Sequence, residues 1–236
     1  MRLHNCPDRR TIKKLLVAVA TVAILAGIGA GYWFYRSLDQ IAKSAIEHFG
    51  SAATQTQVRV DRVKLSLEDG SGMISGLTVG NPRGFKTATA VKADAVKIAV
   101  DPASIAGDVL VIRSIDVAAP RISYESGEGG SNFDVLLKNI GRNAGRDADA
   151  KTPGRKLIID RLVIRDATLS YTSAITAGRT LTIPLADIRL SGIGRSAGGV
   201  APGELAMAIV EALLDRIKRA LALDVIQRGV QGLFGK

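Results

Sequence analysis

The spacing of hydrophobic positions changes three times along the chain, and each stretch predicts a different kind of element. Residues 15–35 carry no charge, and at about 1.5 Å per residue this run would span roughly 31 Å as a helix, the thickness of a bilayer core. Residues 36–56 place apolar side chains at helical spacing and predict a second helix that ends near Gly50. Residues 57–200 consist of short runs of Val, Ile, Leu and Thr broken by turn residues, which predicts strands, and 201–236 return to helical spacing.

One apolar motif recurs in the strand region: two apolar residues two apart, a step of three, then two more. Side chains alternate between the two faces of a strand, so the step of three keeps all four on one face only if a bulge takes up one residue. Repeated bulges predict a curved, mainly antiparallel sheet with one apolar face. The motif occurs at Val58/Val60/Val63/Leu65, Val91/Ala93/Val96/Ile98, Leu110/Ile112/Ile115/Val117 and Leu157/Ile159/Leu162/Ile164.

Two of these copies belong to a longer internal repeat. The segments LVIRSIDVAAPRISY at 110–124 and LIIDRLVIRDATLSY at 157–171 align without a gap, with apolar residues in register up to Tyr124 and Tyr171. We therefore expect these two segments to form equivalent parts of the sheet.

Three connecting segments have interpretable patterns. Asp101 followed by Pro102 predicts a single short helix, and Ser131 is placed to cap a helix that continues to Ile140. Residues 141–156 contain almost no apolar side chain and predict an exposed loop. The helix expected at 203–234 is amphipathic, and its mixed charges favour docking on the apolar face of the sheet over lying on a membrane.

The flanks of the 15–35 run predict its orientation in a membrane. Basic residues precede it and aromatic residues end it, so the positive-inside rule keeps the N-terminus in the cytoplasm and places residues 36–236 on the outer side. The alternative is a cleaved signal peptide, although typical apolar regions of such peptides have only about 7–15 residues. The predicted domains are a tail at 1–14, a transmembrane helix at 15–35, a juxtamembrane helix at 36–56, a sheet domain at 57–200 and a C-terminal helix at 201–236. The expected membrane-interface residues are Arg9, Arg10, Lys13, Lys14, Tyr32, Trp33, Phe34 and Tyr35.

Composition restricts the chemistry that the chain can perform. The 236 residues include one Cys, which excludes a disulfide framework and a multi-cysteine zinc site, and two His, which leave almost no material for a His-based metal site or a Ser-His-Asp triad. The net charge is +10, but the basic residues are not clustered with stacking aromatics, so we expect no nucleic-acid binding. We expect no catalytic residue, no metal site and no cofactor; anionic lipid headgroups are a simpler use of the charge.

Four segments support a family resemblance. The stretches LTVGNPRGF at 77–85, VLVIRSIDVAAPRISYE at 109–125, GGSNFDVLLKNI at 129–140 and IPLADIRLSGIGRSAGGVAPGELAMAIV at 183–210 resemble the AsmA-like family of bacterial envelope proteins. The resemblance implies a β-rich α+β fold in the periplasm with an apolar groove similar to those of bridge-like lipid transfer proteins. It also implies a single-pass protein of the bacterial inner membrane that handles phospholipid or maintains the outer membrane. This chain is far shorter than the larger members, so it would need further copies or a partner to bridge an envelope.

The candidate site is the apolar face of the sheet, and we expect it to bind phospholipid acyl chains. The alternative without a binding function is that these residues form an ordinary hydrophobic core beneath the C-terminal helix. A different functional class is a non-enzymatic scaffold that assembles with envelope proteins or with a further copy through sheet edges or small residues of the membrane helix. The predicted face consists of Leu65, Leu67, Ile98, Val100, Ile115, Val117, Leu162 and Ile164.

Overall fold

The computed structural model describes residues 37–66, 68–127, 129–148, 155–173, 176 and 179–234. By its contacts the chain divides after Ile41, and the fold described below is that of the unit which begins at Ala42. The predicted tail, the predicted membrane helix and all eight predicted interface residues lie outside the described residues. Within the part that is described, no helix is long and apolar enough to cross a membrane.

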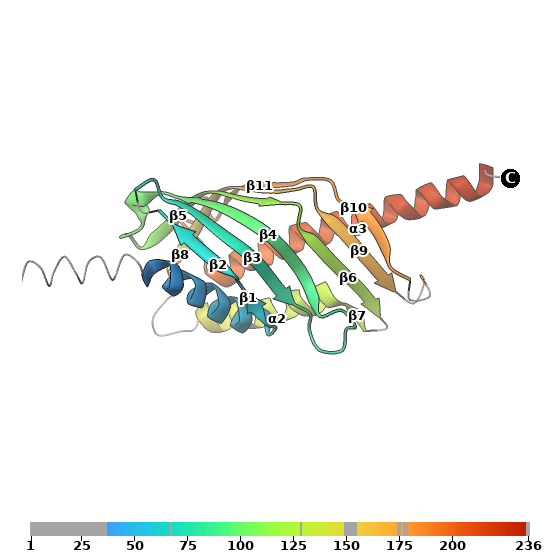
Figure 1. Ribbon diagram of the computed structural model, residues 1–236, viewed down its shortest axis with the longest axis horizontal. Coiled ribbons are helices and arrows are strands. Elements are labelled where there is room, and N and C mark those ends of the chain that lie inside the picture. Colours follow the sequence, from blue (N-terminus) through green and yellow to red (C-terminus); the bar gives the residue numbers. More distant parts are fainter. Residues whose placement is uncertain are drawn as a thin grey trace, which may run out of the picture. The chain divides into compact units, whose positions relative to one another are not determined.

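The described chain builds an α+β fold around one mixed sheet of 11 strands (Figure 1). Every neighbouring pair is antiparallel except β5 with β8 and β6 with β9, which are parallel. The strands are β1 (Val58–Arg59), β2 (Arg62–Leu65), β3 (Ser71–Gly80), β4 (Thr89–Val100), β5 (Val109–Ala118), β6 (Arg121–Gly127), β7 (Gly130–Ser131), β8 (Lys156–Arg165), β9 (Thr168–Ser173), β10 (Leu181–Pro184) and β11 (Ile188–Ile193).

Several strands are halves of longer, interrupted rows. β5 pairs with the second half of β4 and β6 with its first half, so that β5 and β6 together run the length of β4. β8 and β9 follow β5 and β6 in the same way, and β11 and β10 then pair with them. On the other side of β4, β3 pairs with both β1 and β2.

The internal repeat is confirmed as two neighbouring parallel rows in register. Leu110 lies opposite Leu157, and the same offset continues through the interruption to Tyr124 opposite Tyr171. Each row is interrupted at the same point by a residue with positive φ, Ala119 at 48° and Asp166 at 54°. The Ala119 N–H donates to the Arg165 carbonyl at 2.8 Å, which joins the two rows across this interruption. Equivalent sequences therefore form equivalent, adjacent strands.

The prediction of a curved sheet is wrong, because the sheet is not curled. The apolar residues before and after the step of three do lie on one face of the sheet. In most copies of the motif, however, neither of the two paired strands contains an extra residue. At Asp61 the facing residue Gly76 has φ of 65°, and the pairing has the same register on both sides of the step. Asp160 faces Gly192, at φ of 64°, in the same way. Since both strands break together, neither gains a residue relative to the other, and the bending expected of a bulge does not accumulate. True register shifts occur at Val79/Gly80 and at Ala99/Val100.

Helices lie on one side of the sheet (Figure 1). They are the helix at residues 37–54, of which 42–54 belong to this unit, α2 (Asn132–Ala148) and α3 (Pro202–Phe234). The 42–54 part is fastened to the edge of the sheet: Glu47 Oε1 accepts from the Val60 N–H at 2.9 Å, and Ser51 Oγ accepts from the Val58 N–H at 2.9 Å.

Ser131 caps α2 as predicted. Its hydroxyl accepts from the Asp134 N–H at 3.1 Å, and Asp134 Oδ2 accepts in return from the Ser131 N–H at 2.8 Å, which is a reciprocal capping box. The loop expected from residue 141 begins later, because α2 continues to Ala148. Asn143 supplies part of the reason: its amide donates to the Ala52 carbonyl at 2.9 Å and so ties this turn to the end of the 37–54 helix.

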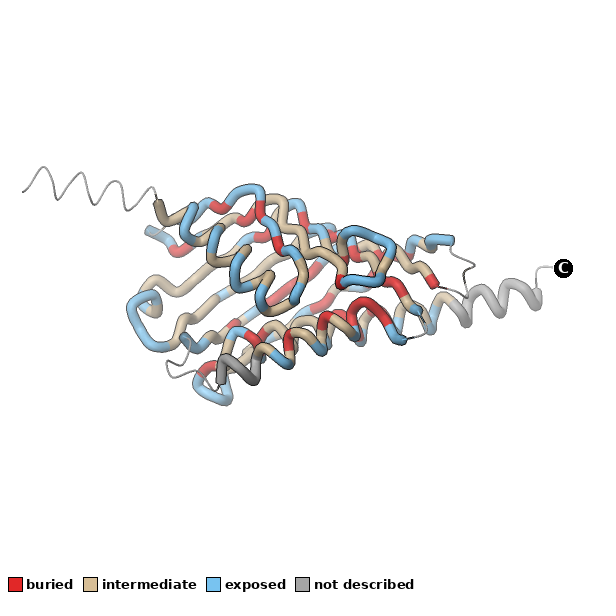
Figure 2. Tube along the Cα trace, turned by 90° about the horizontal axis from the view of Figure 1, so that it is seen from below, coloured by how far each residue is buried: buried red, intermediate tan, exposed pale blue. Residues whose placement is uncertain are grey.

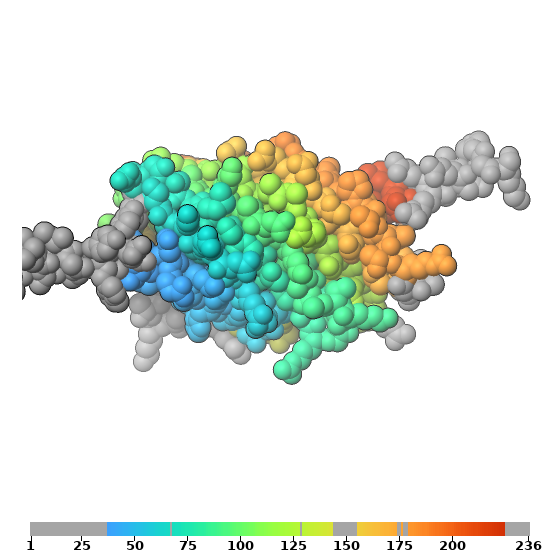
Figure 3. Space-filling model, in the orientation of Figure 1, coloured from blue at the N-terminus to red at the C-terminus, as the bar shows by residue number. Residues whose placement is uncertain are grey.

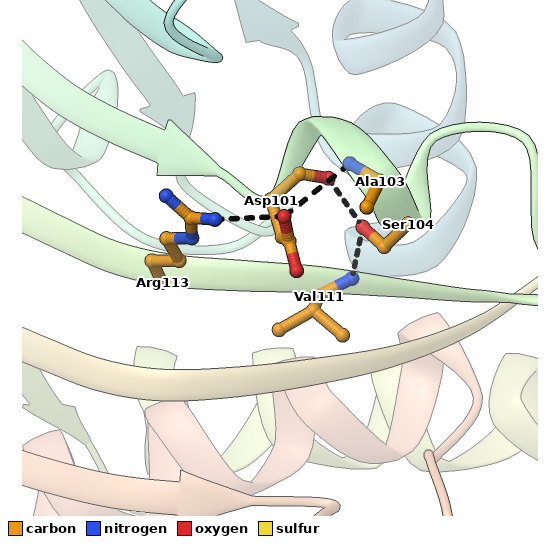
Figure 4. A network of polar contacts seen from close by, with 5 residues as sticks. All are labelled: Asp101, Ala103, Ser104, Val111 and Arg113. Carbon is orange, nitrogen blue, oxygen red and sulfur yellow. Dashed lines mark hydrogen bonds and ion pairs between the residues drawn. The ribbon is translucent and has the colours of Figure 1, made fainter.

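The predicted short helix after β4 is present as the 3₁₀ helix η1 (Pro102–Ser104), and it closes the connection to β5 (Figure 4). Asp101 Oδ1 accepts from the Ala103 N–H at 3.3 Å and from Arg113 Nη2 at 2.8 Å. The Ser104 hydroxyl donates to the Asp101 carbonyl at 2.7 Å and accepts from the Val111 N–H at 3.0 Å. One aspartate thus fixes the turn and the strand that follows it.

The helix side of the sheet contains two apolar clusters. Figure 2 shows how buried positions are distributed along the chain. The larger cluster joins β6, β8, β9, β10 and β11 to α2 and α3, and Leu205, Leu213 and Ile217 of α3 are buried in it. The C-terminal helix therefore docks on the sheet, as its spacing predicted. The smaller cluster joins β2, β3 and β4 to Ala42 and Ile46 of the 37–54 helix.

Candidate functional site

The predicted apolar face separates into buried and partly exposed residues. Leu162 and Ile164 are 2% and 8% exposed and lie in the core with α3. These two residues are therefore part of the same apolar cluster as Leu205, Leu213 and Ile217 of α3. Leu65 is 38% exposed at the end of β2, and Val100 is partly buried at the end of β4. Leu67 lies outside the described residues.

Ile98, Ile115 and Val117 are different, and we call these three residues the seam. Ile98 is the neighbour of Ile115 across β4 and β5, and Val117 is two residues further along β5, opposite Val96. All three are partly buried. Ile115 and Val117 pack against both apolar clusters, and Ile98 packs against the smaller one. The seam is therefore where the part of the sheet packed with the 42–54 helix meets the part packed with α2 and α3.

A buried polar network lies at the other end of β4, and the sequence analysis did not identify it. Glu125 is 7% exposed, and its carboxylate accepts from the Thr87 N–H at 2.7 Å, the Lys86 N–H at 2.8 Å, the Asn81 amide at 3.0 Å and the Thr87 hydroxyl. Burial raises the pKa of Glu125, but these hydrogen bonds outweigh burial, so that the pKa lies below its usual value.

Asn132 completes this network from the first residue of α2. It is fully buried, and its side chain donates to Asn81 Oδ1 at 2.7 Å and to the Ser123 carbonyl at 2.7 Å, while Oδ1 accepts from the Glu125 N–H at 3.0 Å. Asn81, Glu125 and Asn132 come from three of the segments that carry the family resemblance. We call Asn81, Glu125 and Asn132 the clasp. Their role is structural, because their hydrogen bonds hold the 81–88 connection against β6 and α2.

The sequence contains a weak signal for this clasp. Glu125 is the only acidic residue of the 121–127 strand, and Asn132 comes immediately before Phe133, the first apolar residue of the helix. A buried carboxylate requires several donors, but the sequence does not show that the donors come from a turn about 40 residues earlier. The sequence alone therefore does not reveal this network.

A shallow hollow beside the 37–54 helix is lined mainly by polar residues, unlike the seam. It opens to solvent between that helix and β1, and Ser44, Glu47, His48, Ser51 and Arg59 are among the residues around it. His48 is exposed and contacts Phe49 edge-on, with ring centroids 5.4 Å apart. Glu47 and Ser51 already hold β1, so the hollow offers little free polar chemistry.

Comparison with known proteins adds no further constraint, since no protein-family model and no curated protein sequence matches the chain.

Proposed function

We propose that this chain is a single-pass, inner-membrane-anchored periplasmic protein that binds a phospholipid acyl chain at the seam, in the service of phospholipid handling or outer-membrane maintenance. The main observation behind this proposal is that Ile98, Ile115 and Val117 remain partly exposed on the apolar side of the sheet, between the two apolar clusters. The AsmA-like segments support the same proposal. Burial of a methylene contributes about 0.8 kcal/mol, so burying about eight methylenes along the seam would contribute roughly 6 kcal/mol.

A second candidate is a non-enzymatic scaffold of the envelope. It is favoured by the burial of Leu162 and Ile164 in the cluster that includes α3, because a face that is occupied by the protein's own helix has less room for lipid. In this candidate the seam is only an imperfectly filled boundary within the core, and the partners are other envelope proteins or a further copy.

The amount of lipid that accompanies the purified protein separates the two candidates. We would extract the full chain in mild detergent and count bound phospholipid by native mass spectrometry, for the wild type and for Ile115→Asp. Ser114→Asp is the matched control, because Ser114 is the preceding residue of β5 and is absent from both apolar clusters. Lipids bound by the predicted membrane anchor should be equally numerous in all three proteins and therefore cancel in the comparison. Loss of one lipid in Ile115→Asp alone supports the proposal; equal lipid in all three, with the wild type and both variants folded, supports the scaffold.

A further inference from the structure

The helix-free side of the sheet carries a group of basic residues at its β1–β4 end. Figure 3 shows the segments from β2 to β4 lying at the surface. Five exposed cations lie on these strands, and none forms a side-chain hydrogen bond or ion pair with another residue that the structure describes. We call them the cationic face: Arg59, Arg62, Lys64, Lys92 and Lys97.

The pairing register brings these residues together across three adjacent rows. Arg59 lies opposite Thr78, which lies opposite Lys92, and Lys64 lies opposite Met73, which lies opposite Lys97. Neighbouring strands are about 4.8 Å apart, so the cations form two lines about 10 Å apart with the uncharged β3 between them.

Most cations on the rest of the same side are paired with acids, whereas Lys156 at the start of β8 is exposed and has no ion pair with a described residue. Arg113 pairs with Asp101 at 2.8 Å, and Arg189 pairs with Asp187 at 2.7 Å. Arg161 and Arg165 share Asp116 at 3.3 and 3.8 Å. Uncompensated positive charge is therefore concentrated at the β1–β4 end of the sheet.

Four acids lie near the cationic face. Asp94 is held by Arg121 through two hydrogen bonds of 3.0 and 2.7 Å, and this pairing keeps the pKa of Asp94 below its usual value. Asp61 lies over Gly76 and is exposed, and Glu68 and Asp69 are exposed in the turn between β2 and β3. Five cations against these three acids without an ion pair among the described residues leave an excess of positive charge.

We propose that the cationic face binds the headgroups of anionic phospholipids at the surface of the membrane in which the chain is anchored. An anionic membrane surface attracts basic groups within about a Debye length, without requiring a precise fit. The short connection to the predicted anchor supports a membrane as the binding partner. Residues 37–54 are helical, and a helix rises about 1.5 Å per residue while an extended chain rises about 3.3 Å. The predicted anchor and Arg59 are therefore separated by at most about 40 Å of chain. The proposal rests on the membrane placement in the proposed function, but not on lipid binding at the seam.

The test uses the full chain in lipid nanodiscs, with a fluorophore on Met73→Cys in a Cys6→Ser background. Met73 lies between Lys64 and Lys97, so a probe there reports on the cationic face. The discs contain phosphatidylcholine alone or mixed with phosphatidylglycerol, and a headgroup-labelled lipid quencher reports contact. We expect stronger quenching with phosphatidylglycerol and loss of that gain at high salt. Each basic residue near an anionic surface raises the equilibrium constant for contact about fivefold, so Lys92→Gln/Lys97→Gln should lower that constant about twenty-five-fold at low salt.

The matched control is Arg165→Gln/Arg189→Gln, which removes two cations from the same side of the sheet that are already paired. It should leave the quenching unchanged, and a probe on Ser191→Cys in β11 should show no gain. Equal quenching in both lipid mixtures, or an equal loss of quenching in the two double variants, would overturn this proposal. Neither result would bear on lipid binding at the seam. A chain that does not incorporate into discs would overturn the membrane placement itself.

Discussion

The buried carboxylate of Glu125 allows the sharpest stability prediction. In Glu125→Gln one acceptor oxygen is replaced by an NH₂ group, which then faces backbone N–H groups of Lys86 or Thr87 instead of accepting from them. A hydrogen bond to a charged group contributes about 1.5–3 kcal/mol, and leaving a buried donor unpaired costs a similar amount. We therefore expect the free energy of unfolding to fall by about 3 kcal/mol, a drop in Tm of roughly 6–12 °C for a domain of this size.

The measurement is thermal unfolding of the full chain in mild detergent, followed by circular dichroism. Glu211→Gln is the control, because Glu211 is exposed on α3 and shares the loss of one negative charge. It should unfold within about 1 °C of the wild type. If Glu125→Gln also unfolds with the wild type, the hydrogen bonds that hold the 81–88 connection contribute nothing to stability, and the clasp interpretation is wrong.

Three further predictions follow from the same structure. Hydrogen bonds lower the pKa of Glu125 in the folded state below the ordinary value of 4.5, so its stabilisation is present above that pH and is lost as the pH falls through the lower folded pKa. On acidification the Tm should therefore fall less steeply for Glu125→Gln than for the wild type, and parallel curves of Tm against pH would contradict this. Gly70→Ala should cost more than Gly84→Ala in Tm, since both have positive φ but a Cβ at Gly70 would lie 2.2 Å from the Val100 carbonyl oxygen while Gly84 has open space. Chemical denaturation should show that Leu162→Ala loses about 2–5 kcal/mol and Leu65→Ala much less, because Leu162 is buried in the larger cluster and Leu65 lies at the exposed end of its strand. Equal losses would contradict the burial of Leu162 in that cluster.

The repeat at 110–124 and 157–171 was predictable because it depends on local pattern alone. Identical spacing of apolar residues produced identical strands, and even the interruption at Ala119 and Asp166 has the same position. The shape of the sheet was not predictable from the same pattern. Whether a step of three bends a strand depends on the residue that faces it, and Gly76 and Gly192 come from other segments whose pairing the local pattern does not specify.

The candidate site was predictable only to the level of a face. Alternation places Leu162, Ile164, Ile115 and Val117 on one side of the sheet, and that assignment agrees with the two clusters. Which of them a helix covers depends on where α3 and the 37–54 helix end and how they dock, which apolar spacing does not encode. Glu125 was missed for a related reason, since its donors are distant in sequence.

Site-specific photo-crosslinking in living cells tests the lipid proposal most directly. A benzophenone amino acid at Ile115 in the full chain, irradiated in cells grown with radioactive phosphate, should attach labelled phospholipid to the protein, while the same group at Ser114 should not. Label at Ile115 alone is the predicted result. A folded, correctly inserted protein that cross-links only to other proteins from Ile115, or that captures lipid equally from both positions, would contradict an acyl-chain site at the seam.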